Sequence, residues 1–109
     1  MSETMPVTTL ALVRARAGRS DELGCRLGVL IEPALSTPGC LRYELQRAPD
    51  DPDLWRIHGL WASEEAMTTY LDMPVVQVFA DILHDRSASL VDLHSFAGSL
   101  ASLEDWRAA

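Results

Sequence analysis

Residues 37–71 constrain the fold most, because they combine a tight turn, two strands and the start of a helix. In the turn, the proline of Pro38-Gly39 presets the first central dihedral, and the glycine supplies the positive φ that a type II turn requires. Residues 40–47 and 54–61 alternate in the manner of strands. Prolines and aspartates at 48–53 suit an exposed connection between them. This stretch therefore predicts an antiparallel hairpin that leads into a helix.

Two helices are expected, one before and one after this hairpin. The first begins near Ser20, whose hydroxyl can cap it, and Pro33 should kink or end it because proline removes a backbone donor. Ser63 can cap the second helix, which runs to Tyr70 or Leu71 and resumes in a further helical segment from Pro74. The first helix carries an apolar stripe at helical spacing, formed by Leu23, Leu27, Leu30, Ile31 and Ala34.

Two more strands complete the pattern. Residues 6–16 are apolar on both alternating faces, which favours a strand buried on both sides, and residues 89–96 form the last strand. The order β-α-β-β-α-β predicts the α+β ferredoxin-like fold, an antiparallel sheet with its helices on one face. A single domain over residues 1–109 is expected, with its core at 6–97 and a tail at 98–109.

The face of the sheet without helices should be apolar enough that its exposure would be costly. A short chain also buries a smaller part of its surface than a long one, so pairing with a second copy would stabilise it. We therefore expect a homodimer formed through the open sheet face. The tail is predicted to form a short helix that reaches the partner with Leu103 and Trp106.

The charge balance excludes several classes of partner. Nine basic residues, all of them arginine, stand against sixteen acidic residues, and the net charge is −7. Nucleic acids and anionic membrane surfaces are bound through clustered basic side chains, so neither is an expected partner. No export signal or membrane-spanning apolar run is predicted. Cys25 and Cys40 form no paired motif and suit a reducing compartment, so a cytoplasmic location without a metal site is expected.

One ordered set of residues in the central segment combines the turn, the hairpin strands and the helix start: Pro38, Gly39, Cys40, Leu41, Tyr43, Glu44, Leu45, Trp61, Ser63, Glu64, Ala66 and Leu71. With these residues the segment resembles the antibiotic biosynthesis monooxygenases, a family also described as quinol monooxygenase-like and built on a dimeric α/β barrel. The resemblance implies cofactor-free oxidation of an aromatic phenol, quinol or polyketide-type molecule, without a metal.

Two positions depart from the family pattern. Gly59 stands where the resemblance implies an acid, and Tyr70 stands where it implies a histidine. A tyrosine with an ordinary pKa is a poor base at neutral pH, so a borrowed general base is not expected here. In haem-degrading relatives an Asn and a His would fall near Ala11 and Ala80, so the sequence favours a function other than haem degradation.

The candidate catalytic residues are Trp61 and Tyr70, which would contact the substrate. Trp55, Gly59 and His84 are candidate substrate-binding residues, because the missing side chain at Gly59 could leave room for a flat ring between the two tryptophans. The alternative for Trp61, held as equally good, is that it is a core residue. For Trp55 and His84 a structural role is the stronger alternative.

Three functions are compatible with this pattern. The leading interpretation is a cofactor-independent monooxygenase, because such a substrate supplies its own electrons to dioxygen and the protein needs only a dry, orienting pocket. The second is a non-catalytic, small-molecule-binding or accessory dimer. The third is a polyketide cyclase or isomerase, which would use the same pocket and consume no oxygen.

Overall fold

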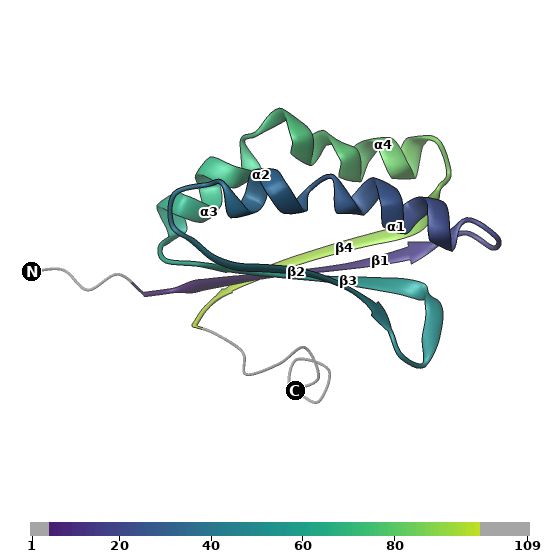
Figure 1. The fold of residues 1–109 in the computed structure, drawn as a ribbon, viewed down its shortest axis with the longest axis horizontal. Coiled ribbons are helices and arrows are strands. Elements are labelled where there is room, and N and C mark those ends of the chain that lie inside the picture. The colour runs from purple at the N-terminus through teal and green to yellow at the C-terminus, as the bar shows by residue number, and fades with distance from the viewer. Residues whose placement is uncertain (1–4, 99–109) are drawn as a thin grey trace, which may run out of the picture.

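The computed structural model describes residues 5–98. Four antiparallel strands form one sheet in the order β2-β3-β1-β4, and the helices all lie over one face of it (Figure 1). The predicted α+β ferredoxin-like fold is confirmed. The elements are β1 (Val7–Ala15), α1 (Ser20–Gly28), α2 (Ile31–Leu35), β2 (Cys40–Ala48), β3 (Asp51–Trp61), α3 (Glu64–Leu71), the 3-10 turn η1 (Pro74–Gln77), α4 (Val78–His84) and β4 (Ala88–Ala97). The predicted tail helix, with Leu103 and Trp106, lies outside the described residues.

The central strand β1 pairs with β3 on one side and with β4 on the other. Ala11 marks the middle of the sheet, since it lies opposite Ile57 in β3 and opposite Leu93 in β4. Ala11, Ile57 and Leu93 face the helices, and the residues before and after each of them face the other side of the sheet, as expected for strands. The middle of β1 therefore borders the space between the sheet and the helices.

Two predicted start signals behave as expected. Gly39 has a φ of +91°, the left-handed conformation that the turn before β2 requires. Ser63 is the N-cap of α3, and its hydroxyl accepts a hydrogen bond of 3.1 Å from the backbone N–H of Ala66. These two local devices fix where β2 and α3 begin.

The first helix differs from its prediction at both ends. Ser20 does not cap α1: Arg19 occupies the cap position, and the Ser20 hydroxyl instead donates to the carbonyl of Pro52 and accepts from Trp55 Nε1 at 3.1 Å. The helix is interrupted after Gly28, earlier than Pro33. Pro33 instead lies in the first turn of α2, where a missing backbone N–H leaves no helical hydrogen bond unmade.

The hairpin connection is shorter than predicted. Residues 48–53 were expected to form it, but β2 extends to Ala48 and β3 already begins at Asp51, which pairs with Ala48. A shift of register between Arg47 and Ala48 accommodates the proline-containing start of β3 at the end of the sheet. As a result β3 spans Asp51–Trp61 and ends three residues before α3 begins at Glu64.

The core lies between the helical layer and the sheet. The predicted stripe supplies Leu23, Leu27, Leu30 and Ala34, all completely buried. They belong to one apolar cluster with Val13 and Ile57 of the sheet and with Ile82 of α4. Burying each large aliphatic side chain contributes about 1.5–3 kcal/mol, so this stripe anchors α1 and α2 on the sheet.

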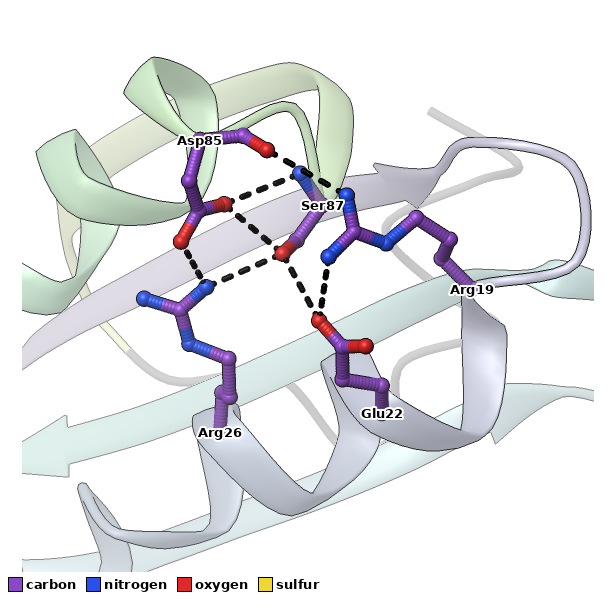
Figure 2. A network of polar contacts seen from close by, with 5 residues as sticks. All are labelled: Arg19, Glu22, Arg26, Asp85 and Ser87. Carbon is purple, nitrogen blue, oxygen red and sulfur yellow. Dashed lines mark hydrogen bonds and ion pairs between the residues drawn. The ribbon is translucent and has the colours of Figure 1, made fainter.

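A polar network ties α1 to the turn between α4 and β4 (Figure 2). The buried Ser87 hydroxyl donates to Asp85 at 2.7 Å and lies 3.1 Å from Glu22, while Arg26 bonds both Ser87 and Asp85. Arg19 bonds Glu22 at 2.6 Å. The hydrogen bonds from Ser87 and Arg26 lower the pKa of Asp85 to about 2, so its carboxylate is charged at neutral pH. This network joins α1 to the segment that connects α4 with β4.

The opposite face of the sheet carries Leu10 and Leu12 of β1 and His58 and Leu60 of β3, and no described helix packs on it (Figure 1). His58 Nδ1 lies 3.9 Å from a carboxylate oxygen of Glu44 on β2. Burial lowers the pKa of His58, against the opposing effect of Glu44. This face is the one predicted to meet a second copy.

Candidate functional site

A cavity of about 150 Å³ lies between the sheet and the helices α3 and α4. Its apolar wall includes Ala11, Ile57, Leu71, Phe79 and Leu93. Among the described residues, the polar ones on its border are Thr9, Tyr43, Tyr70, His94 and Ser95. A small, mostly apolar cavity with a few convergent hydroxyls is typical of a site for a small organic ligand.

Two tyrosines meet at this cavity. The hydroxyl oxygens of Tyr43, on β2, and Tyr70, on α3, lie 2.8 Å apart and share a hydrogen bond in which either can donate. Their rings meet edge to face, with centroids 5.5 Å apart. One O–H of the pair is used within it, and among the described residues neither hydroxyl has another hydrogen-bond partner. The second O–H is therefore available to a molecule in the cavity.

Both tyrosines stay protonated at neutral pH. Burial raises the pKa of Tyr43, and the neighbouring Tyr70 raises it further. Burial also raises the pKa of Tyr70, against a smaller lowering by the hydrogen bond from Tyr43. A group of this kind donates a hydrogen bond and does not remove a proton, so the pair can stabilise a negative oxygen but cannot act as a general base at pH 7.

Trp61 supports this pair from the core. It is completely buried and does not border the cavity. Its ring stacks on Tyr70 with centroids 4.9 Å apart and an angle of 26° between the planes. Its Nε1 donates to the hydroxyl of Thr9 at 3.0 Å. The structure thus brings together the two predicted catalytic residues, Trp61 and Tyr70, but only Tyr70 faces the space.

Gly59 lies among these same side chains. A Cβ at this position would stand 2.5 Å from Thr9 Oγ1, 2.9 Å from Trp61 Nε1 and 3.3 Å from Cδ1 of Tyr43. The room expected here for a ligand is therefore filled by the Trp61–Thr9 hydrogen bond and by the Tyr43 ring. The acid implied at this position by the resemblance would have to displace that hydrogen bond.

The remaining predicted residues lie elsewhere. Trp55, six residues before Trp61 on β3, is about 20 Å away along the strand. It packs against Gly24 and under the guanidinium of Arg47, whose Cζ lies 4.6 Å from the ring centroid. His84 is exposed at the end of α4. Neither Trp55 nor His84 borders the cavity, so the structure does not bring them to Tyr70.

Three residues that border the cavity, Thr9, Tyr43 and Phe79, were not among the site residues predicted from the sequence. A usable signal existed for Tyr43: it lies directly opposite Gly59 in the hairpin, and Thr9 lies opposite Gly59 on the other side. Both neighbours of a glycine in the middle of a sheet can approach its backbone closely. Phe79 could not be selected in this way, because only the packing of α4 on the sheet brings it there.

Two further structural findings concern metals and membranes. Within residues 5–98 no group of three or more His, Cys, Asp or Glu side chains is arranged to hold a metal ion. None of the described helices is both long enough and apolar enough to cross a lipid bilayer.

The match of the sequence to a protein-family model decides the affiliation of the chain. The family model described as antibiotic biosynthesis monooxygenase matches residues 6–82. The chain belongs to this family. The match covers β1 through most of α4, and so it includes Tyr43, Trp61 and Tyr70. The monooxygenase family suggested by the turn and strand residues is thereby confirmed.

Solved structures show the same fold in several organisms. A Pseudomonas aeruginosa protein superposes with a TM-score of 0.79 at 20% identity, over 92% of this chain and 100% of its own. A Deinococcus radiodurans protein, described as a candidate antibiotic biosynthesis monooxygenase, gives 0.77 at 23% identity over 88% and 95%. A Chloroflexus aurantiacus protein described in the same way gives 0.64 at 27% identity over 89% and 96%. No curated protein matches the sequence.

Proposed function

We propose that this member of the family is a cofactor-independent monooxygenase that oxidises a phenol, quinol or related polyketide-type ring. The observation that carries the proposal is the cavity beside the Tyr43–Tyr70 pair, where one O–H is available to the oxygen of an aromatic ligand. A cavity of about 150 Å³ is large enough for benzene. The size therefore favours a single ring within the cavity itself.

The proposed chemistry uses the substrate as the source of electrons. The available tyrosine O–H stabilises the phenolate form of the bound ring, which lowers the pKa of the substrate hydroxyl without a protein base. The ionised ring then reacts with dioxygen inside the apolar wall formed in part by Ile57 and Phe79. For a quinol, one dioxygen is consumed, one of its oxygen atoms enters the ring as a hydroxyquinone oxygen, and the other leaves as water. The substrate loses four electrons and dioxygen gains four.

Trp61 and Tyr70 keep their predicted importance in this proposal, in different roles. Tyr70 contacts the substrate, together with Tyr43. Trp61 acts as a positioning residue, because its ring stacks on Tyr70 and its Nε1 is held by Thr9. Trp55, Gly59 and His84 are left out of the proposed substrate contacts, since none of them borders the cavity.

The test is oxygen uptake with a panel of one-ring phenols and quinols, and with anthrone, in buffer containing a metal chelator. We expect uptake of one dioxygen per quinol without accumulation of hydrogen peroxide. Isotopically labelled dioxygen should place one labelled atom in the product. Peroxide in equal amount to substrate would indicate an oxidase and contradict the proposal.

The same panel separates the two other candidate functions. A ligand that binds tightly and is recovered unchanged would indicate a binding or accessory protein. A rearranged product formed without oxygen uptake would indicate a cyclase or isomerase. Either result, obtained with folded protein, would replace the monooxygenase proposal for that substrate class.

We also propose that the functional unit is a homodimer joined through the open sheet face. Leu12 of β1 and Leu60 of β3 are half-buried on that face, and packing a second sheet against them would remove their remaining surface from water. Light scattering at micromolar concentration should give twice the mass of one chain. A Leu12→Asp variant should shift the protein toward the monomer, and a wild-type protein that is already monomeric would refute the dimer.

A further inference from the structure

A second hollow adjoins the cavity and opens to the surface. This groove has a volume of about 690 Å³, compared with about 150 Å³ for the cavity. It runs along η1 and the start of α4 and reaches β4. Leu71, Phe79 and Leu93 border both spaces, so a molecule that extends out of the cavity past these side chains enters the groove.

The two leucines at this junction are unusually accessible for large apolar side chains. Leu71 is 44% exposed and Leu93 is 55% exposed. Met73, Pro74 and Val76 continue the apolar lining along η1. An apolar surface that leads directly out of a ligand cavity can be covered by the ligand itself, and each buried methylene then contributes to affinity.

We infer that the site takes an elongated, amphiphilic ligand: a phenol-type ring whose oxygen meets the Tyr43–Tyr70 pair, with an uncharged alkyl-like substituent lying in the groove. The identity of the ring rests on the proposed function, whereas the substituent is inferred from the groove. A one-ring ligand would fill the cavity and leave the exposed apolar side chains of Leu71 and Leu93 uncovered. A ligand with a substituent would cover them. The cavity holds the ring, and the groove holds the chain.

The polar residues of the groove restrict the chemistry of the substituent. Asp72 and Gln77 line it, and none of its lining residues within 5–98 is basic. A carboxylate at the end of the chain would meet the Asp72 carboxylate with no cation among these lining residues to offset it, in a protein whose net charge is already −7. The groove therefore favours a neutral hydrocarbon chain over a fatty-acid-like chain.

Calorimetric titration with phenol, 4-ethylphenol, 4-butylphenol and 4-hexylphenol tests this inference. We expect the affinity to rise roughly two- to fourfold for each added methylene. A 4-alkylphenol with a terminal carboxylate should bind at least tenfold more weakly than its uncharged counterpart of equal length. Affinity that does not change with chain length, or a stronger binding of the carboxylate, would overturn the inference.

A matched pair of variants locates the effect in the groove. Ala80 is exposed on α4 and borders the groove but not the cavity. Ala80→Asp should abolish most of the gain from chain length and leave the affinity for phenol within about twofold, because the new carboxylate disfavours a hydrocarbon chain beside it. Leu83→Asp places the same carboxylate on the same helix outside both spaces and should leave the whole series unchanged. Equal losses in both variants would overturn the inference.

The experiment distinguishes its own failure from failure of the proposed function. A chain-length dependence that Ala80→Asp removes, in a protein that takes up no oxygen, would support the amphiphile site and contradict the monooxygenase. Oxygen uptake with phenols that bind equally well at every chain length would support the monooxygenase and overturn the amphiphile site.

Discussion

Replacing both Tyr43 and Tyr70 with Phe should lower the turnover of a phenolic substrate by roughly 10²-fold, because the cavity would lose its donor to the developing phenolate. Either single replacement should cost at most about twofold, far less than the square root of the double loss. In the wild type one O–H is used between the two hydroxyls and one is available to the ligand. In a single variant the remaining O–H can still donate to the ligand, so the two effects should be strongly non-additive.

The measurement is a double-mutant cycle on kcat/KM, with the affinity for unreactive phenol measured in parallel. Thermal unfolding of each variant controls for stability, since losing the hydrogen bond between the tyrosines should cost only about 1 kcal/mol. Turnover by the folded double variant within threefold of wild type would show that the pair does not assist the reaction. Strictly additive single effects would refute the sharing of one donor.

Replacing Gly59 with Ala should lower the free energy of unfolding by about 1–3 kcal/mol, which is the usual cost of forcing atoms into a packed core. The added Cβ would come within 2.5 Å of the Thr9 hydroxyl and 2.9 Å of Trp61 Nε1. The hydrogen bond between those two groups must then lengthen or break. Because Trp61 stacks on Tyr70, the variant should also lose turnover.

Gly28→Ala is the matched control. Gly28 ends α1, and a Cβ there would meet nothing within 4 Å. Alanine has the higher helix propensity and restricts the unfolded chain, so this variant should gain roughly 0.4–1 kcal/mol. Urea unfolding of both variants measures the two changes. A Gly59→Ala variant as stable as wild type would show that the sheet can yield at Thr9 and Trp61.

Most of the fold follows from local sequence signals. Gly39 needs a positive φ and Ser63 satisfies a backbone N–H of α3, and both effects act within a few residues. The stripe from Leu23 to Ala34 likewise follows from helical periodicity. The ferredoxin-like order then follows from the sequence of elements.

The predicted boundaries of elements were wrong where a contact with another element competes with a local signal. Ser20 looks like a helix cap in sequence, but its hydroxyl bonds Pro52 and Trp55 of β3 instead. The proline-rich connection looked long, but pairing of Ala48 with Asp51 extends both strands into it. The partners of Ser20 lie 32 and 35 residues further along the chain, and the Ala48–Asp51 pair forms across the turn of the hairpin. The periodicity of the sequence shows neither contact.

For the site, the sequence by itself determined the residue types and the family, including tyrosine at the position where the resemblance implies a histidine. It placed Trp61 and Tyr70 on adjacent elements, and they do meet. Tertiary structure alone decided that Trp61 faces the core, that Tyr43 joins Tyr70 through their hydroxyls, and that the space at Gly59 is already filled. The physical reason is that periodicity assigns a side chain to a face, whereas the register of the strands and the packing of α3 and α4 decide which neighbours occupy the space beside it.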